Sequence, residues 1–147
     1  MKKLLPTSHA FGVNKSKGFT LVELLVVVSI IAVLSVVGIT LFSGVQQNAR
    51  DAKRKADIDA ISKALEANYT GGSTTPYPAL TDAMFANGKV PTDPRTGSAY
   101  SGVPSGAVAT YSVCATLEKT TGGNSSDTAN PFTYSATGAY YCAKNKQ

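Results

Sequence analysis

The residue with the clearest chemical consequence is Glu23, the only charged residue in the 24-residue apolar run from Phe19 to Phe42. Burying a carboxylate in a membrane-length helix costs about 2.5–3.5 kcal/mol on insertion scales, so such a group usually has a partner and a role. A suitable partner is an amino group, and cleavage of the chain after Gly18 would create one on Phe19. These residues could therefore form a buried ion pair.

The remaining titratable residues give little support for catalysis. The only histidine, His9, lies before Gly18, and no pair of acids forms a recognisable acid–base motif. No glycine-rich segment has the spacing of a phosphate-binding loop. Asp127 lies in a loop rich in Gly, Asn and Ser and is a weak candidate for binding calcium, the alternative being a solvated loop. We therefore expect no enzyme, no cofactor and no metal site.

The two cysteines, Cys114 and Cys142, are predicted to form a disulfide. An even cysteine count in an exported chain favours a disulfide framework. A cross-link over the 27 intervening residues would contribute on the order of 3 kcal/mol. The alternative is two free thiols, and a cysteine pair without other soft ligands makes a poor zinc site.

The apolar run is long enough to cross a membrane. A helix of 24 residues is about 36 Å long, against a hydrocarbon core of about 30 Å. Four lysines precede the run and no basic residue follows before Arg50, so the N-terminus is expected in the cytoplasm and the chain after about residue 43 outside. The alternatives are a secretory signal peptide, for which the run is too long, and a plain anchor in which Glu23 has no role.

The sequence Lys-Gly-Phe-Thr-Leu-Val-Glu-Leu-Leu-Val, residues 17–26, resembles the class III signal of type IV pilins and type II secretion pseudopilins. The resemblance implies that a prepilin peptidase cuts between Gly18 and Phe19 and methylates the new amino terminus of Phe19. It also implies that Glu23 is the assembly acid, which pairs with Phe19 of a neighbouring subunit.

The helix is predicted to continue beyond the apolar run, to about Thr70, because no proline interrupts it and Gly71-Gly72-Ser73 follows. On a helical wheel, one stripe is large and apolar and the opposite stripe is small. We expect the large stripe (Ile58, Ile61, Leu65, Tyr69) to face the globular head. We expect the small stripe (Val45, Ala49, Ala52, Ala56, Ala60, Ala67) to face neighbouring helices, unless it is simply a solvated face. Three charge pairs at helical spacing are also expected: Asp51–Lys55, Asp59–Lys63 and Lys63–Glu66.

The head is predicted to be a small antiparallel sheet with three strands, at 107–117, 132–136 and 138–143. Residues 133–141 are expected to form a hairpin that turns at Thr137-Gly138, and 118–130 a polar loop. Residues 91–100 resemble the Pro-x-Asp-Pro…Tyr segment of major pseudopilins, although Arg95 replaces an aromatic residue there. The predicted fold is α+β and pilin-like, with a leader (1–18), a transmembrane or filament-core half-helix (19–42), an amphipathic half-helix (43–70) and a head (71–147).

These observations predict a structural subunit of a type IV pilus-like surface filament. The expected partners are the chain itself, prepilin peptidase, the inner-membrane assembly machinery and, before assembly, membrane lipid. Within this class the alternative is a minor pilin or a secretion or competence pseudopilin, and from another class a monomeric membrane-anchored binding module. The architecture is used for adhesion, twitching motility, DNA uptake and secretion alike.

Charge gives no direct sign of a nucleic-acid partner. Residues 1–18 hold four lysines and no acids, so their removal lowers the net charge from +5 to +1. The basic residues after residue 71 are few and scattered along the chain (Lys89, Arg95, Lys119, Lys144, Lys146).

Overall fold

The computed structural model of the protein describes residues 18–72 and 74–147. The predicted leader, apart from Gly18, lies outside the described residues, and so does Ser73 at the predicted end of the helix. The chain divides into two compact units, and the boundary falls between Ile39 and Thr40. Each unit is described by itself below.

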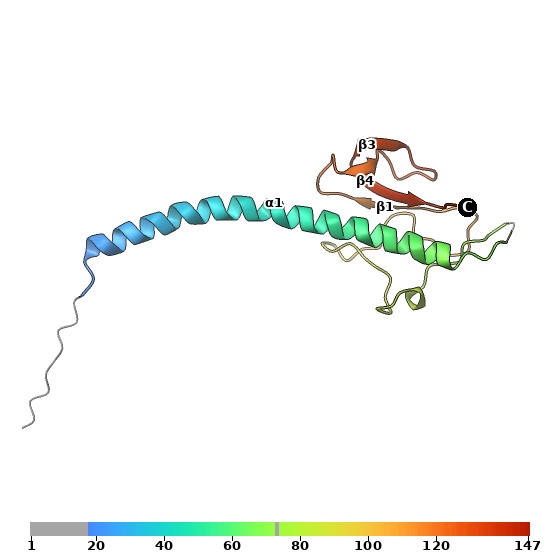
Figure 1. Cartoon of the computed structure of the whole chain (residues 1–147), viewed down its shortest axis with the longest axis horizontal. Helices are drawn as coiled ribbons and strands as arrows, with labels where there is room; N and C mark the ends of the chain where they lie inside the picture. The colour runs from blue at the N-terminus through green and yellow to red at the C-terminus, as the bar shows by residue number, and fades with distance from the viewer. Residues whose placement is uncertain (1–17, 73) are drawn as a thin grey trace, which may run out of the picture. The chain divides into compact units, whose positions relative to one another are not determined.

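A single long helix, α1, runs from Leu21 to Ala67 and contributes residues to both units (Figure 1). It contains no proline, and its composition of aliphatic residues followed by Ala, Lys, Arg and Glu suits a helix throughout. The helix ends where the Asn68 side chain donates to the Ala64 carbonyl at 2.8 Å and where Gly71 takes a φ of 70°. Glycine adopts this left-handed conformation at little cost, so the prediction of one long helix ending before Gly71 is confirmed.

The core of the second unit is built on the predicted large stripe of α1. Ile58, Ile61 and Leu65 are each 0% exposed, so their predicted burial is confirmed, whereas Tyr69 at the end of the stripe is 38% exposed. They pack with three buried tyrosines and the inward residues of the first strand: Tyr77, Tyr100, Tyr111, Val113 and Ala115. The small stripe is largely exposed, from Val45 through Ala56, and its contact with neighbouring helices stays a prediction.

Four short strands form one antiparallel sheet along the second half of α1 (Figure 1). They are β1 (Ser112–Thr116), β2 (Gly123–Ser125), β3 (Tyr134–Gly138) and β4 (Tyr140–Lys144), in the spatial order β1-β4-β2-β3. A short 3-10 helix, η1 (Asp82–Met84), lies in the segment between α1 and β1. The predicted α+β fold, a long N-terminal helix with a small antiparallel sheet, is confirmed.

The predicted hairpin over residues 133–141 is wrong. β3 and β4 are separated by β2, which lies within the segment expected to be a polar loop. Glycine makes this insertion possible, because a Cβ on Gly123 would collide with the Tyr140 carbonyl and a Cβ on Gly138 with the Ser125 backbone. A pattern of alternating polar and apolar residues does not reveal such a strand. The strand is held by close contact between backbones, not by a face of buried side chains.

Candidate functional site

Glu23 lies at the first turn of α1, where it forms a reciprocal cap with Thr20. The Thr20 hydroxyl and backbone N–H donate to Glu23 Oε2 at 2.7 Å and 2.9 Å, and the Glu23 N–H donates to Thr20 Oγ1 at 3.2 Å. This arrangement is a capping box, in which Thr and Glu three residues apart satisfy the unpaired donors at a helix start. Sequence reasoning overlooked Thr20, although the Thr-x-x-Glu spacing before an apolar run was the available signal.

The two residues at the predicted cleavage point are exposed and have little contact with the fold. Phe19 is 84% exposed, and a Cβ added to Gly18 would meet no heavy atom within 4 Å. The fold itself therefore does not require glycine at this position.

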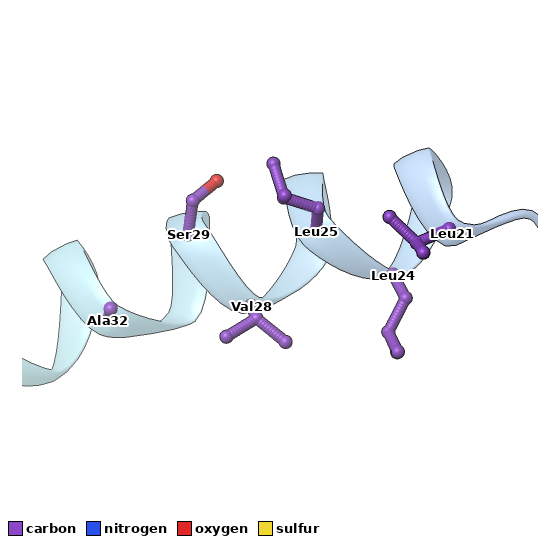
Figure 2. Close-up of a pocket in the computed structure, with 6 residues that line it drawn as sticks. All are labelled: Leu21, Leu24, Leu25, Val28, Ser29 and Ala32. Carbon is purple, nitrogen blue, oxygen red and sulfur yellow. The ribbon is translucent and has the colours of Figure 1, made fainter.

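The helix that follows the cap is apolar on every side. Figure 2 shows Leu24 and Val28 on one side of this stretch and Leu25 and Ser29 on the other. Large aliphatic side chains from Leu21 to Phe42 are exposed all round, which is the pattern of a helix covered by lipid or by other chains. By length and composition, α1 could span a membrane.

Two serines within this stretch satisfy their hydroxyl groups on the helix itself. The Ser29 hydroxyl donates to the Val26 carbonyl and the Ser35 hydroxyl to the Ile31 carbonyl, both at 2.7 Å. Such bonds remove the cost of an unpaired hydroxyl in lipid. Glu23 is thus the one charged group to be accommodated in this part of the chain.

A second cluster, in the other unit, ties α1 to the loops of the head through Arg54. This side chain is 4% exposed and bonds to Asp93 at 2.6 Å, Asp51 at 2.7 Å and Glu118 at 2.9 Å. Arg50 adds a second, bidentate pair with Glu118, both bonds being 2.6 Å long. The cluster joins the helix to the Pro-Thr-Asp-Pro segment and to the residues after β1, so it fixes where the head sits on this part of α1.

The carboxylates of this cluster are held in their charged forms. Hydrogen bonding to Arg50, assisted by Arg54, lowers the pKa of Glu118 to about 2, and hydrogen bonding to Arg54 holds the pKa of Asp93 well below its usual range. Burial raises the pKa of Asp51, but the backbone N–H groups of residues 118 and 119 and the Arg54 guanidinium outweigh it, so the pKa lies below its ordinary value. The cluster is a set of ion pairs at neutral pH.

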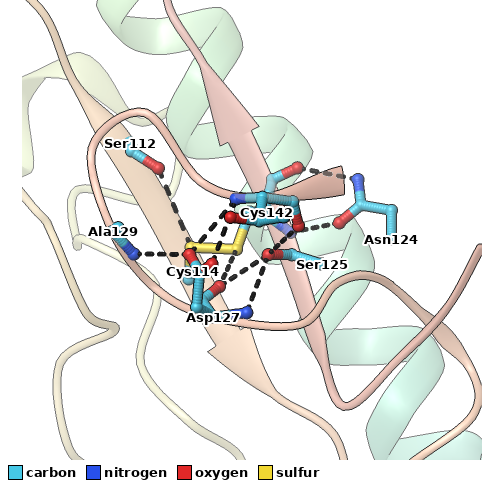
Figure 3. Close-up of a disulfide and its surroundings, with 8 residues drawn as sticks. Ser112, Cys114, Asn124, Ser125, Asp127, Ala129 and Cys142 are labelled. Atoms are coloured by element: carbon cyan, nitrogen blue, oxygen red, sulfur yellow. Dashed lines mark hydrogen bonds between the residues drawn. A yellow bond between two sulfur atoms is a disulfide. The ribbon is translucent and has the colours of Figure 1, made fainter. Parts of the chain in front are cut away.

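The predicted disulfide joins Cys114 of β1 to Cys142 of β4, which lie directly opposite each other in the sheet (Figure 3). Next to it, the Asn124 side chain accepts from the Cys142 N–H at 2.8 Å and donates to the Cys142 carbonyl at 2.9 Å. The side chain of Asn124 therefore makes the hydrogen bonds to β4 that the backbone would make in a regular strand pair.

Asp127, the weak calcium candidate, uses its carboxylate within its own loop. It accepts from the backbone N–H groups of Ala129 at 2.9 Å and of Thr133 at 3.2 and 3.3 Å. Hydrogen bonding to Thr133 and Ala129 lowers the pKa of Asp127. Within residues 18–72 and 74–147, no group of three or more His, Cys, Asp or Glu side chains is placed to hold a metal ion.

Comparison with known proteins identifies the segment around the cap. Residues 13–39 match the family model described as the prokaryotic N-terminal methylation motif. No curated protein and no solved structure matches the chain significantly. The match contains Gly18, Phe19, Thr20 and Glu23 and ends within the apolar half of α1. The chain therefore carries the class III signal peptide of type IV pilin-like proteins.

Proposed function

We propose that the chain is the precursor of a structural subunit of a type IV pilus-like surface filament. It is stored as a single-pass membrane protein, cleaved after Gly18, methylated on Phe19 and polymerised through its N-terminal helix. The observation that carries this proposal is a single carboxylate capped at the start of an all-round apolar helix, within a matched methylation motif.

Cleavage and assembly are linked by charge. Hydrolysis of the peptide bond leaves a carboxylate on Gly18 and an amine on Phe19, and this amine remains a cation when it carries a methyl group. In the precursor, the Glu23 carboxylate is partnered by the neutral Thr20 hydroxyl and backbone N–H. In the filament, the amine of a neighbouring Phe19 supplies the opposite charge. Such buried pairs contribute more to register than to stability, so this pair would set the stagger between adjacent helices.

Two substitutions at Glu23 separate the charge from the cap. Glu23→Gln keeps an oxygen that can accept from Thr20 but removes the charge, whereas Glu23→Ala removes both. Both variants are expected to remain in the membrane and to be lost from sheared surface filaments, as measured by immunoblotting of the two fractions. Assembly of Glu23→Gln at the wild-type level would show that the cap, rather than the ion pair, is the required element. A wild-type chain found only as an uncut monomer would favour a membrane-anchored binding module.

The role of Gly18 is tested by a matched pair of glycines. Neither Gly18 nor Gly38 has a heavy atom within 4 Å of an added Cβ, so alanine is sterically acceptable at both positions. Gly18→Ala is expected to block removal of the leader, whereas Gly38→Ala is expected to be processed normally. Intact-mass analysis detects both outcomes and also shows whether the mature chain begins with a methylated Phe19. Normal processing of Gly18→Ala would contradict the assigned cleavage site.

A minor pilin or a secretion or competence pseudopilin is the second candidate. Its support is the Pro-x-Asp-Pro…Tyr segment, whose Asp93 pairs with Arg54 and whose Tyr100 hydroxyl donates to Asp57 at 2.8 Å. This segment is therefore anchored to α1 at two points. The abundance of the chain in isolated filaments distinguishes the two, since a major subunit makes up most of their mass. A chain present at only a few copies per filament would favour the second candidate.

A further inference from the structure

An exposed turn of the head holds the only asparagine in the sequence that is followed by glycine. Asn87 and Gly88 come shortly after η1, and both are exposed. Gly88 has a φ of 65°, which glycine adopts at little cost, and a Cβ added to it would meet no heavy atom within 4 Å. Gly88 therefore places no side chain between its own nitrogen and the Asn87 amide.

The Asn87 side chain is held in an arrangement that favours attack on its amide carbon. The backbone N–H of Lys89 donates to Asn87 Oδ1 at 3.3 Å. A donor on this oxygen stabilises the negative charge that the oxygen gains when a nucleophile adds to the carbon. The bond also turns the side chain back along the chain, toward the peptide nitrogens that follow Asn87.

The nucleophile is the Gly88 nitrogen, and one hydrogen bond restrains it. Its N–H donates to the Phe85 carbonyl at 2.9 Å, within the same turn. This bond has to open before the nitrogen loses its proton and attacks. Residues 86–89 are all exposed, so the opening uncovers no core residue and costs little compared with unfolding of the head.

Three other asparagines are protected by their surroundings. Asn130 precedes a proline, whose nitrogen carries no proton and cannot attack. Asn124 uses both the oxygen and the nitrogen of its amide on the Cys142 backbone. Asn48 is exposed but lies inside α1, where the next N–H belongs to the hydrogen bonds of the helix. The exposed turn thus gives Asn87 a freedom that these three residues lack.

We propose that Asn87 is a site of spontaneous deamidation. The Gly88 nitrogen forms a bond to Asn87 Cγ, the bond from Cγ to Nδ2 breaks, and the proton of the Gly88 nitrogen leaves with Nδ2 as ammonia. Water then opens the cyclic imide, adding its hydroxyl to one ring carbonyl carbon and its remaining proton to the Gly88 nitrogen. Opening at Cγ gives aspartate, and opening at the main-chain carbonyl carbon gives isoaspartate. The reaction consumes one water and needs no oxidant, reductant or enzyme.

The modification changes both the charge and the backbone of the head. Either product adds one negative charge to the exposed turn. Isoaspartate also adds a methylene group to the main chain, within the segment that Asp82 closes by accepting from the Val90 N–H at 2.7 Å. The head therefore becomes more acidic as the chain ages. This chemistry is independent of the proposed role in a filament.

The test is incubation of the full chain in a neutral detergent at pH 8 and 37 °C, followed by peptide mapping with mass spectrometry. The peptide that contains Asn87 is expected to gain the mass difference between an amide and an acid and to separate into two products. The rate is expected to rise from pH 6 to pH 8, because a base removes the Gly88 proton. Asn87→Gln keeps an amide but forms the imide far more slowly, so this mass gain is expected to disappear from its peptide. Conversion of Asn87 no faster than that of Asn68 or Asn145 would overturn the proposal.

A second variant separates the turn from the dipeptide. Ala49→Gly creates the same Asn-Gly pair at Asn48, which is exposed but lies within α1. The helix holds the following N–H more firmly than the turn does, so Asn87 is expected to react at least about tenfold faster than Asn48 in this variant. Equal rates at the two positions would overturn the part assigned to the turn, because the dipeptide alone would then explain the reaction.

Discussion

Replacement of Arg54 by methionine tests whether the ion cluster holds the head on its part of α1. Arg54 bonds to Asp51, Asp93 and Glu118 together, and its side chain is 4% exposed. Methionine has a similar length and helix propensity, so the helix itself is preserved. The three carboxylates would then lie close together, with Arg50 left to pair with Glu118 alone.

The expected loss follows from the burial of the partners. Removing one member of a buried ion pair typically costs about 3–5 kcal/mol, because the remaining charge stays buried without its partner. The side chains of Asp93 and Glu118 are 17% and 13% exposed, so water can reach them and the lower end applies. We expect a loss of about 3 kcal/mol, equivalent to a fall in Tm of roughly 12–24 °C for a unit of about 100 residues.

The assay is thermal unfolding of the full chain in a neutral detergent, followed by near-ultraviolet circular dichroism. This signal comes from packed tyrosines such as Tyr77, Tyr100 and Tyr111, so it reports the head rather than the apolar half of α1. Arg95→Met is the matched control, because Arg95 is exposed and belongs to no ion pair among the described residues. It is expected to change stability by less than about 0.5 kcal/mol.

Equal Tm values for the two methionine variants would refute the reasoning. A second variant examines the cause, since Arg54→Met combined with Asp51→Asn and Asp93→Asn removes the uncompensated charges. If buried charge is the source of the loss, this triple variant is expected to be more stable than Arg54→Met alone. If it is less stable still, the hydrogen bonds of the carboxylates, rather than their charges, hold the head.

Three further predictions concern the head. The pKa of Glu118 is lowered to about 2, so the stabilisation from its charged form is present above its ordinary pKa of 4.5 and is lost as the pH falls toward 2. Unchanged thermal stability between pH 5 and pH 2.5 would contradict this prediction. Replacing Cys114 and Cys142 by alanine removes a disulfide between residues 28 positions apart and is expected to lower the free energy of unfolding by about 3 kcal/mol. Chemical denaturation, compared with the oxidised wild type, measures this loss. Gly138→Ala places a Cβ against the Ser125 backbone and is expected to destabilise the head by several kcal/mol, whereas Gly106→Ala, with no atom within 4 Å, is expected to be tolerated; similar denaturation midpoints would contradict it.

The charged residues of α1 show how far local pattern could predict the structure. Helical spacing predicted that Asp51 pairs with Lys55, and Asp59 and Glu66 with Lys63. In the structure Asp51 binds Arg54, Asp59 accepts from the Tyr141 hydroxyl, and Glu66 accepts from the Tyr111 hydroxyl. A pair on a helix surface is worth only a few tenths of a kcal/mol, so pairing with the nearly buried Arg54 and hydrogen bonds from tyrosines of the head replace it.

The amino-acid sequence by itself determined the elements whose causes are local. The length of the apolar run, the absence of proline and the terminal glycines define α1, and the apolar stripe at Ile58, Ile61 and Leu65 defines its core face. The matched methylation motif is likewise a continuous stretch of sequence. The partner of Glu23 within the precursor, Thr20, was also encoded locally, in the spacing of a capping box.

Only the tertiary structure decided the order of the strands and the partners of Arg54. Each depends on residues that are far apart in the chain, such as Arg54 and Glu118, and no local period records such a distance. β2 is the clearest case, because two glycines that allow backbones to approach place it between β3 and β4. Local sequence determines α1 and the methylation motif, whereas the head takes its arrangement from contacts that exist only once the chain has folded.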